Sequence, residues 1–262
     1  PLVSQGIPFF QLGIDKLRSK SMDRNTYDAG DWFNRVDYTN TSNNWNVGQP
    51  IEASSGLTEG VSDNPNSVVT PTQIEQASAV FNEFLQIRHS SRLFRLTDEA
   101  QIIRCLGFHN TGPSQTKGLI VMSIDDGVGV TDLDENVDAI VVVVNGTAVA
   151  QSHAVKSASG FTLHEVQQSS ADSVVRQASF SEDGTYGTFT VPAQTVAVFV
   201  RQQGAEQGAG LAADPEYVVS PYGDTELLAE ALSASSALSY DGRGVYTMSF
   251  TTDAAVTEFD IA

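Results

Sequence analysis

The pattern of apolar and polar positions divides the chain into stretches of different period. Residues 1 to about 70 show neither helical nor strand periodicity and are punctuated by glycines, which predicts loops after a short apolar piece ending at Phe10. From Thr70 to about Leu96, apolar side chains recur at steps of three and four. Thr70 is a good N-cap and Pro71 suits the first helical position, so this stretch predicts a long helix with one apolar face.

Beyond about residue 98 the period changes to that of strands. Four short segments are rich in β-branched residues and bounded by Gly, Asn, Asp or Pro: Gly118–Ile124, Ala139–Val144, Gly187–Val191 and Thr195–Val200. Short strands joined by turns, with no second long helix, predict an antiparallel β-sandwich. The segment 101–108 is also predicted to be a strand, with the single cysteine, Cys105, as a small buried hydrophobe.

Composition narrows the functional classes. The 262 residues include 14 Lys and Arg against 32 Asp and Glu, a formal charge of −18, which argues against a nucleic-acid partner. The hydrophobic fraction of 40% argues against a disordered chain, and no apolar run reaches the roughly 18 residues needed for membrane insertion. The excess of carboxylates suggests a saline habitat. The first residues lack a basic signal region, so we expect the chain to begin within a longer protein.

The stretch from Leu12 to Tyr38 is the densest candidate site. Arg, Asp and Asn alternate there with Tyr and Trp, as in a loop that binds sugar hydroxyls and stacks on pyranose faces. A solvated, well-capped loop is the alternative, and both interpretations stay open. Five carboxylates in this stretch could supply the acid and the nucleophile of a glycosidase: Asp15, Asp23, Asp28, Asp31 and Asp37. Their spacing in the sequence does not show that any two of them face each other.

Three sequence motifs in this region and just before it resemble those of a known family. They are Gln5-Gly-Ile-Pro-Phe-Phe10, Leu17-Arg-Ser-Lys-Ser21 and Tyr27-Asp-Ala-Gly-Asp-Trp-Phe-Asn-Arg35. They look like the eighth-strand region of bacterial pullulanases, α-1,6-debranching members of the α-amylase superfamily. The resemblance continues in order through further words: Asn44-Trp-Asn-Val-Gly48, Leu85–Leu96, Phe108–Pro113, Gly118–Gly127 and Asp138–Asn145. Several long words in one order are far more specific than one short motif.

The resemblance implies a mixed fold. In such enzymes a (β/α)8 barrel carries the active site on the loops after its strands, and a β-sandwich follows. Residues 1–98 would be the last strand, loop and helix of that barrel, and 99–201 an all-β antiparallel sandwich. Residues 202–213 would be a linker. Residues 214–262 would be a partial small β-sandwich module, resembling truncated accessory or carbohydrate-binding domains, with Ala229–Ser236 replacing the expected sugar-binding word.

The resemblance also implies an activity. The parent enzyme would cleave α-1,6 branch linkages in pullulan, starch or glycogen by a retaining mechanism with two carboxylates. The family carries its last catalytic Asp in a His-Asp word, which this chain lacks, so we predict no catalytic residue here and expect the fragment alone to be inactive. The partners would be the branched α-glucan and the missing N-terminal part. The enzyme would be secreted or attached to the cell envelope.

By resemblance, the matching sequence motifs imply one substrate-binding loop in this chain. Its residues are Arg18, Ser19, Arg24, Asn25, Tyr27, Asp28, Asp31, Trp32 and Asn34. Arg24, Asn25 and Asp31 are the preferred candidates for hydroxyl hydrogen bonds, and Tyr27 or Trp32 for stacking. The family often has Asp where Asn25 stands, which suggests weaker binding.

No cofactor or metal is predicted, although calcium is possible, because Asp132–Asp138 alternates oxygen ligands like the start of a calcium loop. A solvated loop before a strand is the favoured interpretation of that segment. The alternative to a debranching enzyme is a non-catalytic carbohydrate-binding or structural β-sandwich protein.

Overall fold

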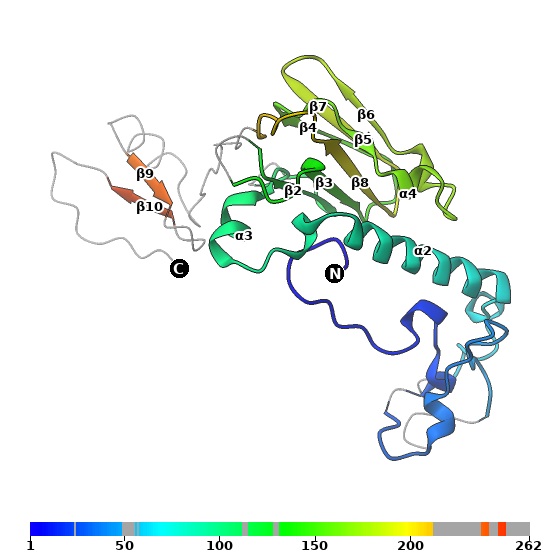
Figure 1. Cartoon of the computed structure of the whole chain (residues 1–262). Coiled ribbons are helices and arrows are strands. Elements are labelled where there is room, and N and C mark those ends of the chain that lie inside the picture. Colours follow the sequence, from blue (N-terminus) through cyan, green and yellow to red (C-terminus); the bar gives the residue numbers. More distant parts are fainter. Residues whose placement is uncertain are drawn as a thin grey trace, which may run out of the picture. The chain divides into compact units, whose positions relative to one another are not determined.

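The structure is a computed structural model that describes residues 1–23, 25–48, 56, 58–111, 115–127, 131–211, 237–240 and 246–249 (Figure 1). It divides into two compact units. The first unit comprises Pro1–Ser90 and Glu165–Arg176, and the second comprises Ser91–His164 and Gln177–Ala262. Within the described residues, no helix has the length and apolar character required to cross a membrane.

The first unit combines short helical turns with one long helix. The turns are η1 (Ile14–Lys16), η2 (Lys20–Met22), η3 (Asp31–Asn34) and η4 (Pro65–Ser67), and the long helix is α2 (Pro71–Ser90). The short helix α4 (Glu165–Gln168) belongs to the same unit, and the turn η6 (Val175–Gln177) spans the point where the chain returns to the second unit. Among the described residues before Thr70, the irregular course of the chain confirms the prediction of loops. No strand forms over residues 5–10, so the structure does not confirm a barrel strand.

Helix α2 starts where the sequence predicts and stops early. The Thr70 hydroxyl accepts a hydrogen bond from the Gln73 backbone N–H at 3.3 Å, and the Gln73 side chain accepts one from the Thr70 N–H at 2.9 Å. The helix ends at Ser90, so the predicted end near Leu96 is wrong. Ser91 adopts extended angles (φ −133°, ψ 143°), and its hydroxyl accepts from the Leu93 N–H. A separate turn, η5 (Arg92–Arg95), therefore follows.

Arg88 of α2 holds the first residues of the chain. Its guanidinium donates to the carbonyl oxygens of Leu2 at 3.0 Å, Ser4 at 2.8 Å and Gly6 at 2.5 Å. Three backbone acceptors that no strand satisfies are thus met by one side chain.

Two further contacts continue this attachment toward the start of α2. The rings of Phe10 and Phe81 meet edge to face, with centroids 5.2 Å apart. The Lys16 ammonium donates to the Ser78 hydroxyl at 2.8 Å. Because the residue numbers rise along the segment as they fall along the helix, the N-terminal segment runs antiparallel to α2.

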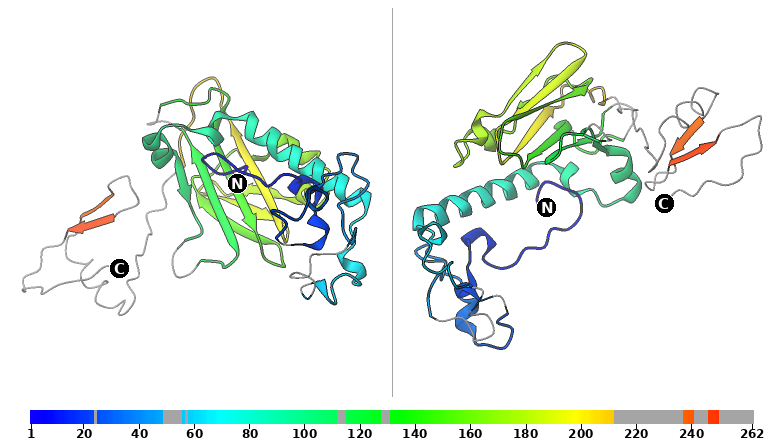
Figure 2. Two further views of the ribbon diagram at one scale, coloured as in Figure 1. Left: turned by 90° about the horizontal axis from the view of Figure 1, so that it is seen from below. Right: turned by 180° about the vertical axis from the view of Figure 1, so that it is seen from behind.

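The second unit is built on two antiparallel sheets (Figure 2). The larger sheet has the order β1-β2-β3-β8-β5, and the smaller has the order β4-β7-β6. Every strand pair is antiparallel, which confirms the predicted sandwich. The strands are β1 (Leu106–Phe108), β2 (Leu119–Asp125), β3 (Val137–Asn145), β4 (Gln151–Lys156), β5 (Thr162–Leu163), β6 (Ser179–Glu182), β7 (Tyr186–Val191) and β8 (Thr195–Gln202). A separate hairpin pairs β9 (Ala237–Tyr240) with β10 (Tyr246–Ser249).

A cluster of phenylalanines joins the two sheets. Phe189 of β7 and Phe199 of β8 are both fully buried, and their ring centroids lie 5.0 Å apart. Phe180 and Phe161 extend the cluster at 4.9 Å and 5.3 Å from Phe189. Such aromatic contacts add to the free energy gained by burying apolar surface, so this cluster forms the centre of the core.

The segment predicted as a strand from residue 101 is mostly helical. Helix α3 (Glu99–Cys105) is capped by Asp98, whose carboxylate accepts from the Gln101 N–H at 3.0 Å. The cap and the acidic first turn override the β preference of the isoleucines that follow. Cys105 is buried as predicted, and burial raises the pKa of its thiol to about 11.

After β8 the chain crosses the ends of β2 and β3 in a segment that we call the strap (residues 207–211). The Gly208 N–H donates to the Asp138 carboxylate at 2.8 Å, and the Leu211 N–H donates to the Asp125 carboxylate. A Cβ on Gly127 would overlap the strap backbone at Gly210, so the close approach requires glycine.

Beside the strap, Asp126 is fully buried. One carboxylate oxygen accepts from the N–H groups of Leu133 at 2.7 Å and Asp134 at 3.1 Å, whereas the other has no partner among the residues that the structure describes. Burial, followed by the nearby charges of Asp132 and Asp125, raises the pKa of Asp126 to about 6.

Candidate functional site

The predicted sugar-binding loop is held by hydrogen bonds between side chains and backbone. The Ser19 hydroxyl donates to the Asn43 carbonyl at 2.7 Å, and the Asn43 amide donates to the Leu17 carbonyl at 2.9 Å. The Arg18 guanidinium donates to the Asn34 carbonyl at 3.2 Å. These bonds join the first half of the loop to segments some twenty residues later, so the loop has a defined shape without sheet structure.

A second set of bonds fixes the segment that closes the loop. The buried Asn44 amide donates to the Arg35 carbonyl at 2.9 Å. The Asp37 carboxylate accepts from the hydroxyls of Thr39 at 2.6 Å and Thr41 at 2.7 Å, and from the Ser42 N–H at 2.9 Å. These bonds, with that of the Thr39 hydroxyl the largest contribution, hold the pKa of Asp37 well below its usual range.

The side chains suited to sugar recognition face solvent. Tyr27 is 86% exposed and Trp32 is 42% exposed. Turn η3 presents Asp31, Trp32 and Asn34 together, because a 3-10 turn of four residues directs neighbouring side chains outward around a buried Phe33. The loop therefore combines exposed rings with exposed carboxylates and amides, which a carbohydrate site needs.

Trp32 lies in a defined cradle. The Phe33 ring packs against the Trp32 indole, with a centroid distance of 4.0 Å and an interplanar angle of 36°. Gly30 and Gly48 lie beside the indole, both with positive φ, 102° and 79°. A Cβ on Gly30 would lie 3.5 Å from Trp32 Cδ1, whereas a Cβ on Gly48 would overlap the six-membered ring.

Eight of the nine predicted site residues are described by the structure, and they divide into two groups. Arg18 and Ser19 are partly buried, and their polar atoms hold the loop together. The side chains of six others face solvent: Asn25, Tyr27, Asp28, Asp31, Trp32 and Asn34. Arg24 lies outside the described residues. Sugar contacts by all nine residues stay predictions.

Sequence reasoning missed the residues that shape the site. Asn43 and Asn44 hold the loop closed, and Gly48 borders Trp32. The word Asn44–Gly48 belonged to the family resemblance but carried no assigned role. Its run of Asn and Gly, residues that tolerate positive φ, was the available signal for a tightly folded segment.

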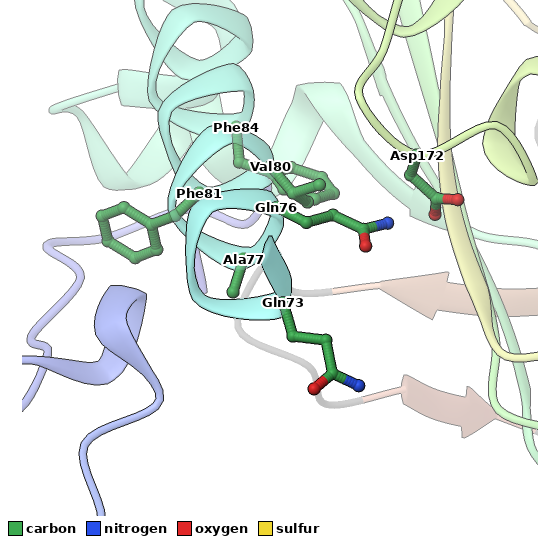
Figure 3. Close-up of a pocket in the computed structure, with 7 residues that line it drawn as sticks. All are labelled: Gln73, Gln76, Ala77, Val80, Phe81, Phe84 and Asp172. Carbon is green, nitrogen blue, oxygen red and sulfur yellow. The ribbon is translucent and has the colours of Figure 1, made fainter. Parts of the chain in front are cut away.

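An open groove of about 420 Å³ lies along α2 within the same unit. Its lining consists of Gln73, Gln76, Ala77, Val80, Phe81, Phe84 and Asp172. Figure 3 shows Phe81 directed to the opposite side of the helix from Asp172. The residues after α4 are fixed to the same helix, since the Glu83 carboxylate accepts from the Ser170 hydroxyl at 2.6 Å and the Ala171 N–H at 2.7 Å.

The candidate calcium segment uses its carboxylates internally. Asp134 accepts from the Ser91 hydroxyl at 2.6 Å and the Arg92 N–H at 3.0 Å. Asp138 lies 3.8 Å from the Arg201 guanidinium, besides its bond to the strap. In the described ranges, no three His, Cys, Asp or Glu side chains are grouped so that they could hold a metal ion.

Comparisons with known proteins give the family of the chain. The family described as "Alpha-1,6-glucosidases, pullulanase-type, C-terminal" matches residues 40–202. The chain is 40% identical over 217 residues to a pullulanase of Klebsiella pneumoniae, covering 80% of this chain and 19% of the relative. It is 41% identical to "Pullulanase 1, chloroplastic" of Arabidopsis thaliana, over 77% of this chain and 22% of the relative.

Solved structures give the same result. The maltotriose complex of PulA from Klebsiella pneumoniae matches with a TM-score of 0.70 and 39% identity, covering 81% of this chain and 23% of that chain. PulA from Klebsiella oxytoca matches with a TM-score of 0.71 and 37% identity, over 82% and 21%. An antiparallel sandwich preceded by an irregular loop and a long helix thus has pullulanase relatives in sequence and structure. The chain belongs to the pullulanase-type α-1,6-glucosidase family and corresponds to its C-terminal part. It spans about a fifth of the length of these relatives.

Proposed function

We propose that this chain is the C-terminal part of an enzyme that hydrolyses α-1,6 branch linkages in an α-glucan such as pullulan, starch or glycogen. The observation that carries the proposal is the 40% identity to a pullulanase over 80% of the chain. The chain contributes the loop of residues 12–38 to the substrate site. A non-catalytic carbohydrate-binding or structural protein is not favoured, because the curated relatives are pullulanases.

The exposed loop supplies the recognition chemistry. A relative was crystallised with maltotriose, an α-glucan fragment. Tyr27 and Trp32 offer rings for stacking on pyranose faces, and Asp31 and Asn34 offer hydrogen-bond partners for hydroxyls. The carboxylates that break the glycosidic bond lie in the part of the enzyme upstream of this sequence.

The proposal includes a barrel origin for residues 1–98. Its support is a pair of highly exposed apolar side chains: Ile7 is 82% exposed and Phe9 is 89% exposed, in a segment that hydrogen-bonds through Arg88 instead of a neighbouring strand. Strands of a (β/α)8 barrel are apolar on both faces, so a segment that lacks its neighbouring strands exposes apolar side chains to solvent.

Isothermal titration calorimetry of the chain with maltotriose tests the sugar site. Trp32→Ala and Tyr27→Ala should weaken binding by about tenfold, as expected for loss of a stacking ring. Tyr186→Ala, which removes an exposed ring from β7, is the matched control and should bind as the unchanged chain does. Equal affinity in all four proteins would remove the loop from the substrate site.

An activity assay tests whether the catalytic carboxylates lie outside this chain. The purified chain should release no reducing ends from pullulan. Activity that disappears on substitution of a carboxylate in residues 12–38 would contradict the placement of the catalytic groups upstream.

A further inference from the structure

We propose that Gly48 is a positioning residue that holds the Trp32 indole in the orientation of a sugar platform. This inference rests on the proposed function and deepens it, because it identifies what sets the geometry of the platform. Gly48 has no side chain with which to contact a sugar. Its contribution is the absence of a side chain at one edge of the ring.

The contacts of Trp32 carry the argument. Phe33 packs on the indole at a centroid distance of 4.0 Å, and the Gly48 backbone adjoins the six-membered ring so closely that a Cβ there would overlap Cη2 and Cζ3. At the five-membered ring, a Cβ on Gly30 would make only an ordinary contact of 3.5 Å with Cδ1. Gly48 therefore limits the indole sterically, whereas Gly30 leaves it room.

An indole stacks on a sugar only when its face is presented at the correct angle. Trp32 keeps 42% of its surface exposed while Phe33 and Gly48 fix the ring, so the platform is set before any ligand arrives. A methyl group at position 48 would force the indole to turn away from Gly48 or to separate from Phe33. The platform would then lose its orientation although no sugar-contacting side chain has changed.

The chain offers a matched control for the backbone. Gly48 and Gly60 have nearly the same φ, 79° and 76°, but a Cβ on Gly60 would have no described atom within 4 Å. Gly48→Ala and Gly60→Ala thus impose the same backbone strain in the same unit, and only the first reaches Trp32. Any effect found for Gly48→Ala and not for Gly60→Ala is attributable to the side-chain contact.

The experiment uses the whole chain with Trp45→Phe, which leaves Trp32 as the single emitter, since the sequence has two tryptophans. Without sugar, Gly48→Ala should change the emission maximum of Trp32 and its quenching by acrylamide, and Gly60→Ala should not. With maltotriose, Gly48→Ala should weaken binding about tenfold, and Gly60→Ala by less than about twofold.

A double substitution guards against unfolding of the variant. If the methyl group added by Gly48→Ala acts through the indole, its effect on stability should disappear when the indole is absent. The double variants Gly48→Ala/Trp32→Ala and Gly60→Ala/Trp32→Ala should therefore have the same unfolding midpoint. Coupling between positions 48 and 32 supports the proposal. Identical quenching and identical unfolding shifts for the two alanine variants would overturn it. Failure of the unchanged chain to bind maltotriose would refute the proposed sugar site, while the quenching and the coupling would still decide the role of Gly48.

Discussion

The sandwich and the candidate loop of residues 12–38 are stabilised in opposite ways. The sandwich buries a contiguous cluster of phenylalanines between two sheets, with Phe189 and Phe199 fully inaccessible to solvent. The loop has few regular elements and relies on side chains that bond to the backbone, while Tyr27 and Trp32 stay exposed. The comparison indicates that the sandwich keeps its aromatic rings for stability, whereas the loop leaves its rings available for a ligand.

Removal of a phenylalanine ring from the sandwich core should have the largest effect on stability. Phe199→Ala should lower the free energy of unfolding by about 3–5 kcal/mol, because it loses buried surface and leaves a cavity beside Phe189. Urea denaturation followed by circular dichroism measures the change. Phe9→Ala, at a ring that is 89% exposed, should change the stability by less than about 0.5 kcal/mol. Comparable losses in the two variants would abolish the distinction between buried and available rings.

The buried carboxyl of Asp126 should make the sandwich less stable as the pH rises from about 4 toward neutrality. Its folded pKa of about 6 lies above the ordinary pKa of 3.8, so the folded state holds its proton more tightly than the unfolded state does. The associated stability is fully present below about pH 4 and is lost as the pH rises through 6, by up to about 3 kcal/mol.

Asp126→Asn should remove this pH dependence, since an amide stays neutral. Unfolding curves at pH 5 and pH 8 should therefore converge for Asp126→Asn and diverge for the unchanged chain. Glu135→Gln, at an exposed position nearby, should retain the divergence. A pH dependence that survives Asp126→Asn would assign the effect to another group.

A smaller and more local effect is expected at Arg88. Arg88→Ala leaves the carbonyl oxygens of Leu2, Ser4 and Gly6 without their shared donor, at a cost of about 1–2 kcal/mol. Hydrogen exchange should increase over residues 2–16, and the exchange rates of β2, β3 and β8 should not change. Arg88→Lys tests the geometry, because one ammonium cannot replace the forked guanidinium. Faster exchange throughout the sandwich would show that the two units unfold together.

The sandwich strands were predictable because their β-branched runs are long and bounded by turn residues, as in Ala139–Val144 within β3. Two boundaries were not. Helix α2 ends at Ser90 because Ser91 caps a new turn, and α3 replaces a predicted strand because Asp98 caps it. In both cases one hydrogen bond of a short polar side chain outweighed the propensity of the apolar residues around it.

The candidate site was predictable in composition and not in geometry. The alternation of Asp, Asn and aromatic residues made the loop a candidate, and six of the predicted side chains are exposed there. Sequence alone did not show that Ser19 and Arg18 bond to the segment at residues 34–43, because those contacts join distant positions. Nor did it show that Gly48 adjoins Trp32, since only the folded loop brings the two together.

The attachment of the N-terminal segment to α2 has a consequence for biosynthesis. Leu2, Ser4 and Gly6 leave the ribosome well before their hydrogen-bond donor, Arg88, which follows more than eighty residues later. The attachment of these first residues can therefore form only after the helix is synthesised, whereas the hydrogen bonds within residues 17–44 do not depend on Arg88. The local contacts of α2 itself carry no such delay. In this chain the helix is expected to fold first and to serve as the template on which the earlier residues settle.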